Sequence, residues 1–254
     1  MQWSRTWLPL TALALVAAAS ASPTRAQQAQ TPGCASLPTA AELQGLLRDA
    51  ASGTGISVSL GPDTDAGGIF GGSRMWGAIV NRQGQLCAVN TSTDDPTQVF
   101  PGSRAIAEAK AYTANAFSLD DFDLPTARMY TLTQPGHSLA GLNNSNPFDP
   151  RALSAPSQPG IGANQIAAGI ITFGGGVPLY QDGRIVGGLG VSGDTSCADH
   201  EVAKRARDLA GLNPPDGPLS DDIVYAAVDG PSMFAHPICP NTKRNGVFLG
   251  DEAP

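Results

Sequence analysis

The feature that most constrains the fold is a strand and turn pattern in the second half of the chain. The runs Val177–Tyr180 and Arg184–Val191 are rich in apolar residues, and Asp182-Gly183 stands between them. Asp-Gly supplies the positive φ angles that a two-residue hairpin turn needs. The pattern therefore predicts an antiparallel hairpin, with a further strand at 170–173 that is separated from it by a kink at 174–176.

Capping patterns predict three helices. Thr39–Glu42 and Ser196–Asp199 have the spacing of residues that satisfy the free amides of a helix N-terminus. Helices are expected over 40–51 and from 196 to about 212. Ser103 is placed to cap a third helix that runs through Phe117.

The remaining strands are expected in the first half and near the end. Residues 75–80 and 86–89 are separated by turn residues and predict a second hairpin. Shorter strands are expected at 56–60 and, at a sheet edge, at 221–226. The glycine-rich segment 61–74 is expected to be a surface loop. Together these elements predict a single α+β domain in which helices cover an antiparallel sheet.

Composition disfavours a nucleic-acid-binding protein and is sufficient for a folded core. The chain has 254 residues, and its 15 Lys and Arg against 22 Asp and Glu give a formal charge of −7. Nucleic-acid binding is disfavoured, because it relies on clustered cations. Hydrophobic residues make up 41% of the chain, enough for an ordinary core.

The N-terminus has the pattern of a secretory signal peptide. Arg5 precedes an apolar run over 8–19, and small residues follow up to Ala26. The apolar run is too short to span a membrane. We expect a signal peptide over 1–26, a flexible N-terminus over 27–36, and a periplasmic or secreted protein.

Four cysteines are consistent with an oxidising compartment. Cys34, Cys87, Cys197 and Cys239 can pair in three ways. The pairing Cys34 with Cys87 and Cys197 with Cys239 is favoured because each bridge would hold a terminal segment against the body. Since no two cysteines have CxxC spacing, the sequence does not favour a thiolate metal site.

The sequence offers few side chains for chemistry. No pair of its three histidines has HExxH or HxxxH spacing. His200 is expected to project from the apolar stripe of its helix, either as a solvated residue or as a contact for a ligand at the rim of the sheet. Lys110 and Thr113 lie on the body-facing side of their predicted helix. We expect Lys110 and the glycines at 174–176 to border a common cavity.

Several segments resemble the GlcG/HbpS family of haem-binding or haem-degrading proteins, which includes the C-terminal domain of PduO-type adenosyltransferases. They are Trp76–Arg82, Ala107–Ala114, Gly174–Tyr180, Gly187–Gly193 and Asp199–Ala203, in the family's order. The resemblance implies an antiparallel sheet of about five strands with helices on both faces, commonly in homo-oligomers.

The resemblance covers roughly Leu37 to Leu212. It implies a GlcG/HbpS-like domain over 37–254, with inserts at 61–74 and 133–160 and a C-terminal extension from 213. It also implies haem as the cofactor.

Haem requires an apolar slot, cations for its propionates and an axial donor to its iron. His200 is the first candidate for the donor, ahead of His137, His236 or a tyrosine. Arg104 and Lys110 are the candidate cations. The other candidate contacts are Phe100, Thr113, Gly175, Gly176 and Tyr180.

Two further functions are compatible with the sequence. The first is an exported enzyme for a small organic acid or aldehyde, in which Lys110 holds a carboxylate and Asp199 or His200 moves a proton. The second is a homo-oligomeric accessory protein without catalytic activity.

Overall fold

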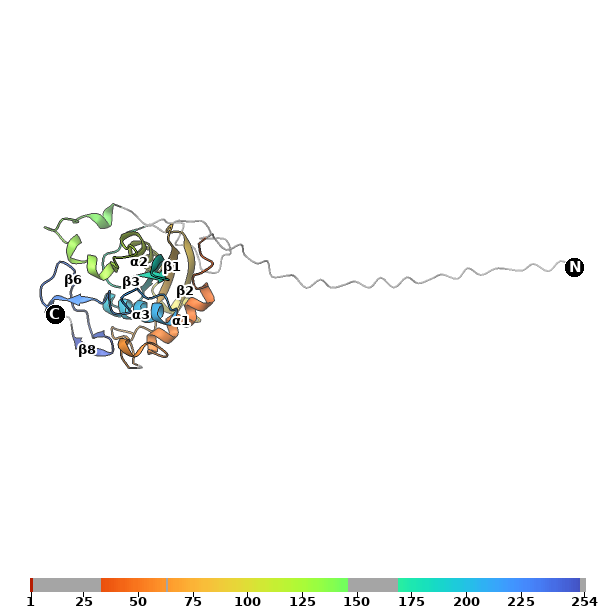
Figure 1. The fold of residues 1–254 in the computed structure, drawn as a ribbon. Coiled ribbons are helices and arrows are strands. Elements are labelled where there is room, and N and C mark those ends of the chain that lie inside the picture. The colour runs from red at the N-terminus through yellow and green to blue at the C-terminus, as the bar shows by residue number, and fades with distance from the viewer. Residues whose placement is uncertain (2–32, 63, 146–168, 252–254) are drawn as a thin grey trace.

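The computed structural model describes residues 1, 33–62, 64–145 and 169–251. The expected signal peptide and much of the insert at 133–160 lie outside these residues. Helices and strands fold together around one sheet (Figure 1), which confirms the α+β class. No helix among the described residues is long and apolar enough to cross a bilayer.

The central sheet has four antiparallel strands, one fewer than the approximate number expected. They are β1 (Trp76–Asn81), β2 (Leu86–Thr91), β3 (Gly176–Gln181) and β4 (Arg184–Ser192), and their spatial order is β2-β1-β4-β3. Each half of the sheet is one of the predicted hairpins. β1 and β4 pair with each other at the centre.

Three helices cover the two faces of the sheet. They are α1 (Ala40–Ser52), α2 (Ser103–Phe117) and α3 (Ser196–Leu209). Figure 1 shows α2 on one side of the strands and α1 with α3 on the other. The helices predicted over 40–51 and 103–117 are confirmed, and α3 ends a few residues before the expected position.

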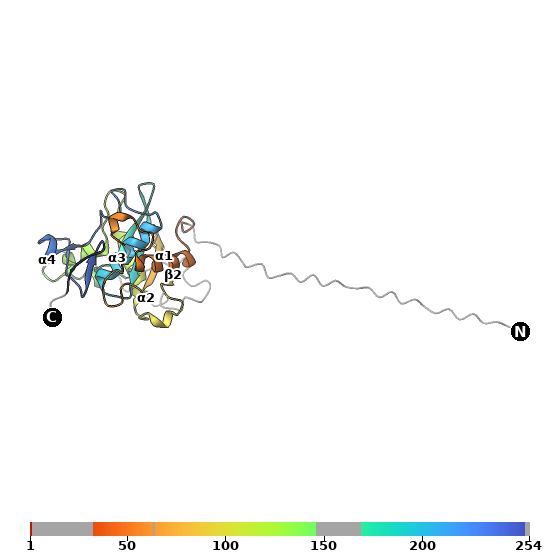
Figure 2. The same cartoon turned by 90° about the horizontal axis from the view of Figure 1, so that it is seen from below.

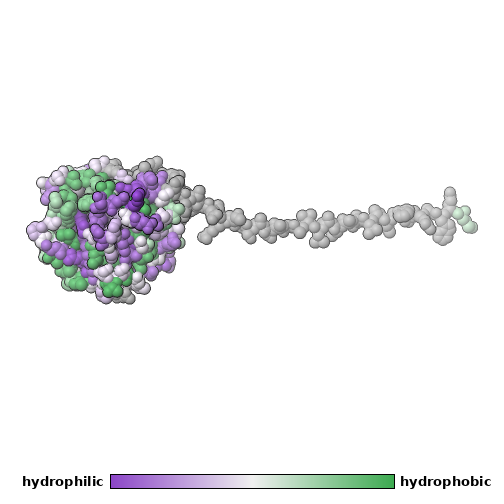
Figure 3. Space-filling view, viewed as in Figure 1, coloured by the Kyte–Doolittle hydropathy of each residue, from purple (hydrophilic) through white to green (hydrophobic). Residues whose placement is uncertain are grey.

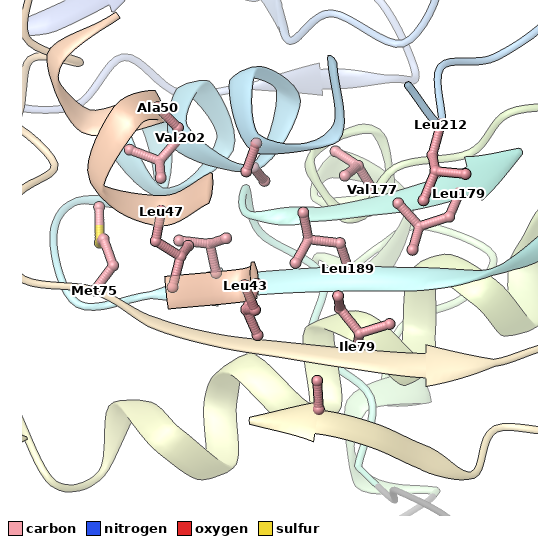
Figure 4. Packing of buried hydrophobic residues seen from close by; sticks show 14 of the residues in the cluster. Leu43, Leu47, Ala50, Met75, Ile79, Val177, Leu179, Leu189, Val202 and Leu212 are labelled. Atoms are coloured by element: carbon pink, nitrogen blue, oxygen red, sulfur yellow. The ribbon is translucent and has the colours of Figure 1, made fainter. Parts of the chain in front are cut away.

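The larger core lies between the sheet and the pair α1 and α3. Side chains from α1 and α3 meet the alternate strand residues that point to this face, such as Ile79 and Leu189, which are almost completely buried (Figure 4). Because successive strand residues point to opposite faces, their neighbours Ala78 and Val80 belong to a second core beneath α2.

Glycines on β4 allow α2 to lie very close to the sheet. A Cβ atom on Gly190 would lie 1.9 Å from the Ala107 carbonyl oxygen, and one on Gly188 would lie 2.3 Å from that of Ala111. Both alanines are fully buried. Small residues on both surfaces therefore set the position of α2 and of every side chain that it carries.

The cap of α1 is as predicted, but the caps of α2 and α3 are not. Thr39 and Glu42 form the capping box of α1. Thr195, rather than Ser196, accepts the amide of Ala198 at the start of α3. The N-cap of α2 is Gly102, without a side-chain hydrogen bond, so Ser103 does not cap this helix.

Two predicted strands are absent for one physical reason: side chains bind the backbone groups that a neighbouring strand would need. At 56–60 the Ser57 amide donates to Asp208, and the chain forms a 3-10 turn, Val58–Leu60. At 170–173 the Ile171 amide donates to the Thr113 hydroxyl.

The expected edge strand at 221–226 is reduced to two residues and leaves the main sheet. This strand, β5 (Val224–Tyr225), pairs in parallel with β6 (Ala235–His236) in a separate two-stranded sheet. Asp221 and Asp222 lie just before β5. They form ion pairs with Arg207 and Lys204 of α3, respectively.

The C-terminal extension is built from short elements. Besides β5 and β6 it contains α4 (Ala226–Asp229) and the hairpin of β7 (Thr242–Arg244) and β8 (Val247–Gly250). Figures 1 and 2 place this extension at the end of the molecule away from β2. The other short helices are η2 (Pro96–Gln98), η3 (Thr126–Met129), η4 (Thr131–Thr133) and η5 (Leu142–Asn144).

Two disulfides join Cys34 to Cys87 and Cys197 to Cys239, the pairing that the sequence favoured. The first holds the segment before α1 against β2. The second holds the C-terminal extension against the start of α3. On the face shown in Figure 3, hydrophilic and hydrophobic residues are intermixed.

The close approach of α2 to β4 gives a direct test of the packing. We expect Gly190→Ala to lower the free energy of unfolding by about 1–3 kcal/mol or more, because the added methyl group would overlap backbone. Gly45→Ala is the control, since Gly45 lies in α1 with open space around it. It should stabilise the protein by about 0.5–1 kcal/mol. Urea unfolding of both variants measures this difference, and equal stabilities would contradict the packing.

Candidate functional site

A buried ion pair joins the helices on opposite faces of the sheet. The Lys110 ammonium nitrogen lies 2.6 Å from Asp199 Oδ2 and 3.0 Å from the carbonyl oxygen of Val191, near the end of β4. Neither side chain is more than 2% exposed. The ammonium also lies 4.8 Å from the ring centroid of Phe173. Lys110 and Asp199, both predicted site residues, are therefore brought together.

The other carboxylate oxygen of Asp199 is held by backbone. Oδ1 accepts the amides of Gly193 and Asp194 at 3.1 and 2.9 Å. Burial lowers the pKa of Lys110 and raises the pKa of Asp199 to about 6, and the charge of each partner opposes the other's shift. The pair is thus satisfied internally.

The triple glycine packs against this ion pair, where the sequence predicted that Lys110 and the glycines would border a common cavity. A Cβ on Gly175 would lie 2.7 Å from the Lys110 ammonium, and one on Gly176 would lie 2.5 Å from the Lys110 carbonyl oxygen. Gly175 also has a φ of +118°, which other residues rarely adopt. The glycines and Lys110 therefore meet by direct packing, and the ammonium itself fills the space beside them.

His200 is fully buried, which excludes the first of its two expected roles, that of a solvated residue. Among the residues that the structure describes, neither ring nitrogen has a hydrogen-bond partner. Burial lowers its pKa well below the ordinary value, and the charge of Lys204 adds to the shift. The neutral form of the ring is therefore favoured in the folded protein, and a Cβ on Gly174 would lie 3.2 Å from the His200 Cβ.

Thr113 and Tyr180 are occupied by structural hydrogen bonds. The Thr113 hydroxyl donates to the Ala109 carbonyl and accepts the Ile171 amide. The Tyr180 hydroxyl donates to the Leu119 carbonyl. Both therefore hold loops in place around the sheet.

Arg104 and Phe100 lie near the start of α2, and Phe100 is 59% exposed. Arg104 pairs with Glu108 at 3.0 Å and lies 5.8 Å from the Trp76 ring centroid. Phe100 contacts Phe70 at 5.9 Å between ring centroids, and the Arg74 guanidinium lies 5.0 Å from the Phe70 ring.

These aromatic rings border a surface hollow of about 240 Å³. The hollow combines apolar rings with one exposed cation, Arg74. Its lining residues are Phe70, Arg74, Thr97, Gln98, Val99, Phe100 and Pro101.

The loop that forms one wall of this hollow is held by Asp194. Its carboxylate accepts the backbone amides of Ile69, Phe70 and Gly72. Phe70 and Arg74 are not among the predicted site residues, because the glycine-rich pattern of 61–74 indicates only a surface loop. No local pattern connects this loop with an aspartate that lies more than a hundred residues later.

A second hollow, of about 630 Å³, lies between α1 and the end of α3. None of the predicted site residues lines it. Its lining residues are Ala35, Ser36, Leu37, Pro38, Thr39, Glu42, Gly45, Leu46, Asp49, Leu209, Ala210 and Leu212.

The sequence model of the family described as "Haem degrading protein HbpS-like" matches residues 70–208, more than half of the chain. The chain belongs to this HbpS-like family. The match covers all four strands of the sheet, both helices of the Lys110–Asp199 pair, and the Phe70–Phe100 hollow.

Curated relatives match over a shorter region. The chain is 30% identical over 111 residues to the corrinoid adenosyltransferases PduO of Salmonella typhimurium and of Citrobacter freundii. This region is 44% of the chain and 25% of either relative. The chain thus spans about a quarter of the length of these enzymes.

Two solved structures are similar in fold. Klebsiella pneumoniae protein ORFY is 22% identical, with 74% of this chain and 96% of that chain covered and a TM-score of 0.45. The PduOC:haem complex is also 22% identical, with 68% and 92% covered and a TM-score of 0.44.

The buried ion pair makes a first prediction for the site. Lys110→Met should lower the free energy of unfolding by about 3–5 kcal/mol, because it leaves the Asp199 carboxylate buried without its partner. The double variant Lys110→Met with Asp199→Asn should be more stable than this single variant, since the amide carries no charge. Chemical unfolding at pH 7 measures both.

The matched control for this prediction is Lys243→Met. Lys243 pairs with Asp65 at 2.8 Å on the surface, where the aspartate side chain is 52% exposed. Such a pair contributes about 0–1 kcal/mol. A loss at Lys110 no larger than the loss at Lys243 would refute a stabilising role for the buried pair.

His200 makes a prediction about pH. Its folded-state pKa is depressed, so the unfolded chain takes up a proton below about pH 6.5 while the folded chain does not. Its contribution to stability is therefore present above pH 6.5 and is lost as the pH falls, by up to about 1.4 kcal/mol per pH unit. His200→Leu should have a shallower loss of stability between pH 7 and 5.

The control is His137→Leu, which makes the same substitution at an exposed position. Burial also lowers the pKa of His236 to about 4. His236 therefore adds a loss of stability at low pH to the wild type and to both variants. Only the difference between wild type and His200→Leu therefore reports on His200. Identical slopes would show that His200 is not held neutral.

Proposed function

We propose that this chain is an exported haem-binding protein. The observation that carries the proposal is the match of the HbpS-like haem-degrading family over residues 70–208. The signal-peptide pattern at 1–26 and the two disulfides support export, because disulfides persist in oxidising compartments. A role in haem storage, sensing or degradation is part of the same proposal.

The buried residues predicted to hold haem do not fit it in this conformation. Lys110 already pairs with Asp199, so its ammonium is not free for a propionate. Within the described part of the chain neither ring nitrogen of His200 has a hydrogen-bond partner, so one of them could bind iron, but the residue is fully buried. A haem could reach His200 only after the surrounding segments move apart.

The Phe70–Phe100 hollow fits the outer part of a haem better. Its two rings offer apolar contact to a porphyrin edge, and the exposed Arg74 can meet a propionate through charge-assisted hydrogen bonds. At about 240 Å³ it is smaller than a pocket for a whole drug-sized ligand, so it would hold only part of the porphyrin. Among the described residues that line it, no histidine, cysteine, methionine or tyrosine is present to bind iron.

The enzyme alternative has less structural support. It needs Lys110 to receive a substrate carboxylate, and in the structure Asp199 occupies that position. No exposed pair of acid and base among the described residues favours a specific reaction.

Hemin titration tests the haem proposal. The Soret band should shift and saturate at one equivalent per chain. Arg74→Gln with Phe100→Ser should raise the dissociation constant at least tenfold, because both contacts lie at the hollow. Lack of saturable binding would reject haem as the ligand, and unchanged affinity in the double variant would reject the hollow as its site.

The same titration decides the axial ligand. A bound haem whose Soret maximum is the same in His200→Leu as in wild type binds iron without His200. Loss of the shifted band in this variant, with the fold retained by circular dichroism, would assign His200 to the iron. His137→Leu and His236→Leu are the parallel variants.

A further inference from the structure

A cluster of two cysteines and one histidine lies where the C-terminal extension meets α3. Cys197 stands in the first turn of α3, and His236 and Cys239 come from the extension, beyond the residues that match the family. All three are buried, and one donor atom of each lies within 4.8 Å of the others. This is the one cluster of three or more such donors that could hold a metal in the part of the chain that the structure describes.

The histidine is already oriented as a ligand. Its Nδ1 lies 2.7 Å from the Pro237 carbonyl oxygen, which can only accept a hydrogen bond, so Nδ1 carries the proton. The lone pair is then on Nε2. Nε2 receives a long hydrogen bond, 3.3 Å, from the Gly174 amide, and the Ser196 hydroxyl lies 3.4 Å away. Metal-binding histidines are commonly held in this way by a carbonyl on the other nitrogen.

The spacing suits a small tetrahedral cation once the disulfide is open. With Zn–S bonds of about 2.3 Å and a Zn–N bond of about 2.0 Å, tetrahedral ligand atoms lie roughly 3.5–3.8 Å apart. The three donors are held within 4.8 Å by the backbone of α3 and the extension, so side-chain rotation suffices. The Ser196 hydroxyl lies 3.4 Å from both Nε2 and the Cys239 sulfur, beside the fourth position.

Charge balance favours occupation at this depth. A divalent cation with two thiolates and a neutral imidazole has no net charge, so the site needs no further counter-ion in its apolar surroundings. Those surroundings are Ala127, Ile223 and Tyr225. The position of Cys197 at the N-terminus of α3 stabilises a thiolate, because the helix dipole and free amides there favour negative charge.

We propose that Cys197, Cys239 and His236 form a redox-gated binding site for a zinc-like divalent cation. With the disulfide closed, the sulfurs are bonded to each other and the site is absent. A dithiol reductant opens it: the reductant gives two electrons to the S–S bond, becomes a disulfide itself, and leaves two thiols on the chain. Cation binding then releases the two thiol protons and takes the His236 lone pair.

The experiment uses the full chain and Zn²⁺, with Co²⁺ as a spectroscopic probe. The protein is reduced with a phosphine, which leaves no competing thiol, and is desalted without oxygen. The reduced chain should bind one Zn²⁺, and Co²⁺ should give a thiolate-to-metal charge-transfer band. His236→Ala should weaken Zn²⁺ binding at least tenfold. The oxidised chain should bind no Zn²⁺.

Paired variants separate this site from the other disulfide. Cys34→Ser with Cys87→Ser should keep Zn²⁺ binding, and Cys197→Ser with Cys239→Ser should abolish it. If reduction unfolds the chain, Zn²⁺ should restore its circular dichroism and melting temperature. Failure of Zn²⁺ to bind or to restore the fold, equal binding after His236→Ala, or equal binding by the oxidised chain would each overturn the proposal.

Discussion

The ion pair between Lys110 and Asp199 is the contact on which the arrangement of this protein depends. It links a helix on one face of the sheet to a helix on the other, at the point where β4 ends. The ammonium can pass there because Gly175 presents no side chain, and the carboxylate is held because two amides after β4 turn toward it. Removing either partner would leave a buried charge without compensation.

This pair also bears on the predicted site. It fills the place in which the sequence predicted a guest, so the lysine and the glycines act as part of the framework. The accessible aromatic and cationic surface lies instead at the start of α2, where Asp194 holds the glycine-rich loop against the body. Asp194 and Asp199 are five residues apart, in the segment that joins β4 to α3. This one segment therefore holds both the Lys110–Asp199 pair and the loop that borders the outer hollow.

The C-terminal extension adds a separate feature to the family fold. Its contacts with α3 include the ion pairs of Asp221 and Asp222 and the disulfide of Cys239, and it contributes His236. These contacts attach it to the same helix that carries Asp199. The extension therefore brings new donor atoms to the start of α3.

The sequence by itself determined the two hairpins, the three helices and the α+β class, because turn residues and the spacing of apolar residues act over a few positions. It also placed Lys110 on an inward face. Only the tertiary structure decided that Lys110 meets Asp199, that His200 is enclosed, and that Phe70 joins Phe100. These outcomes depend on backbone approach and on hydrogen bonds between residues far apart in the chain, which no local pattern encodes.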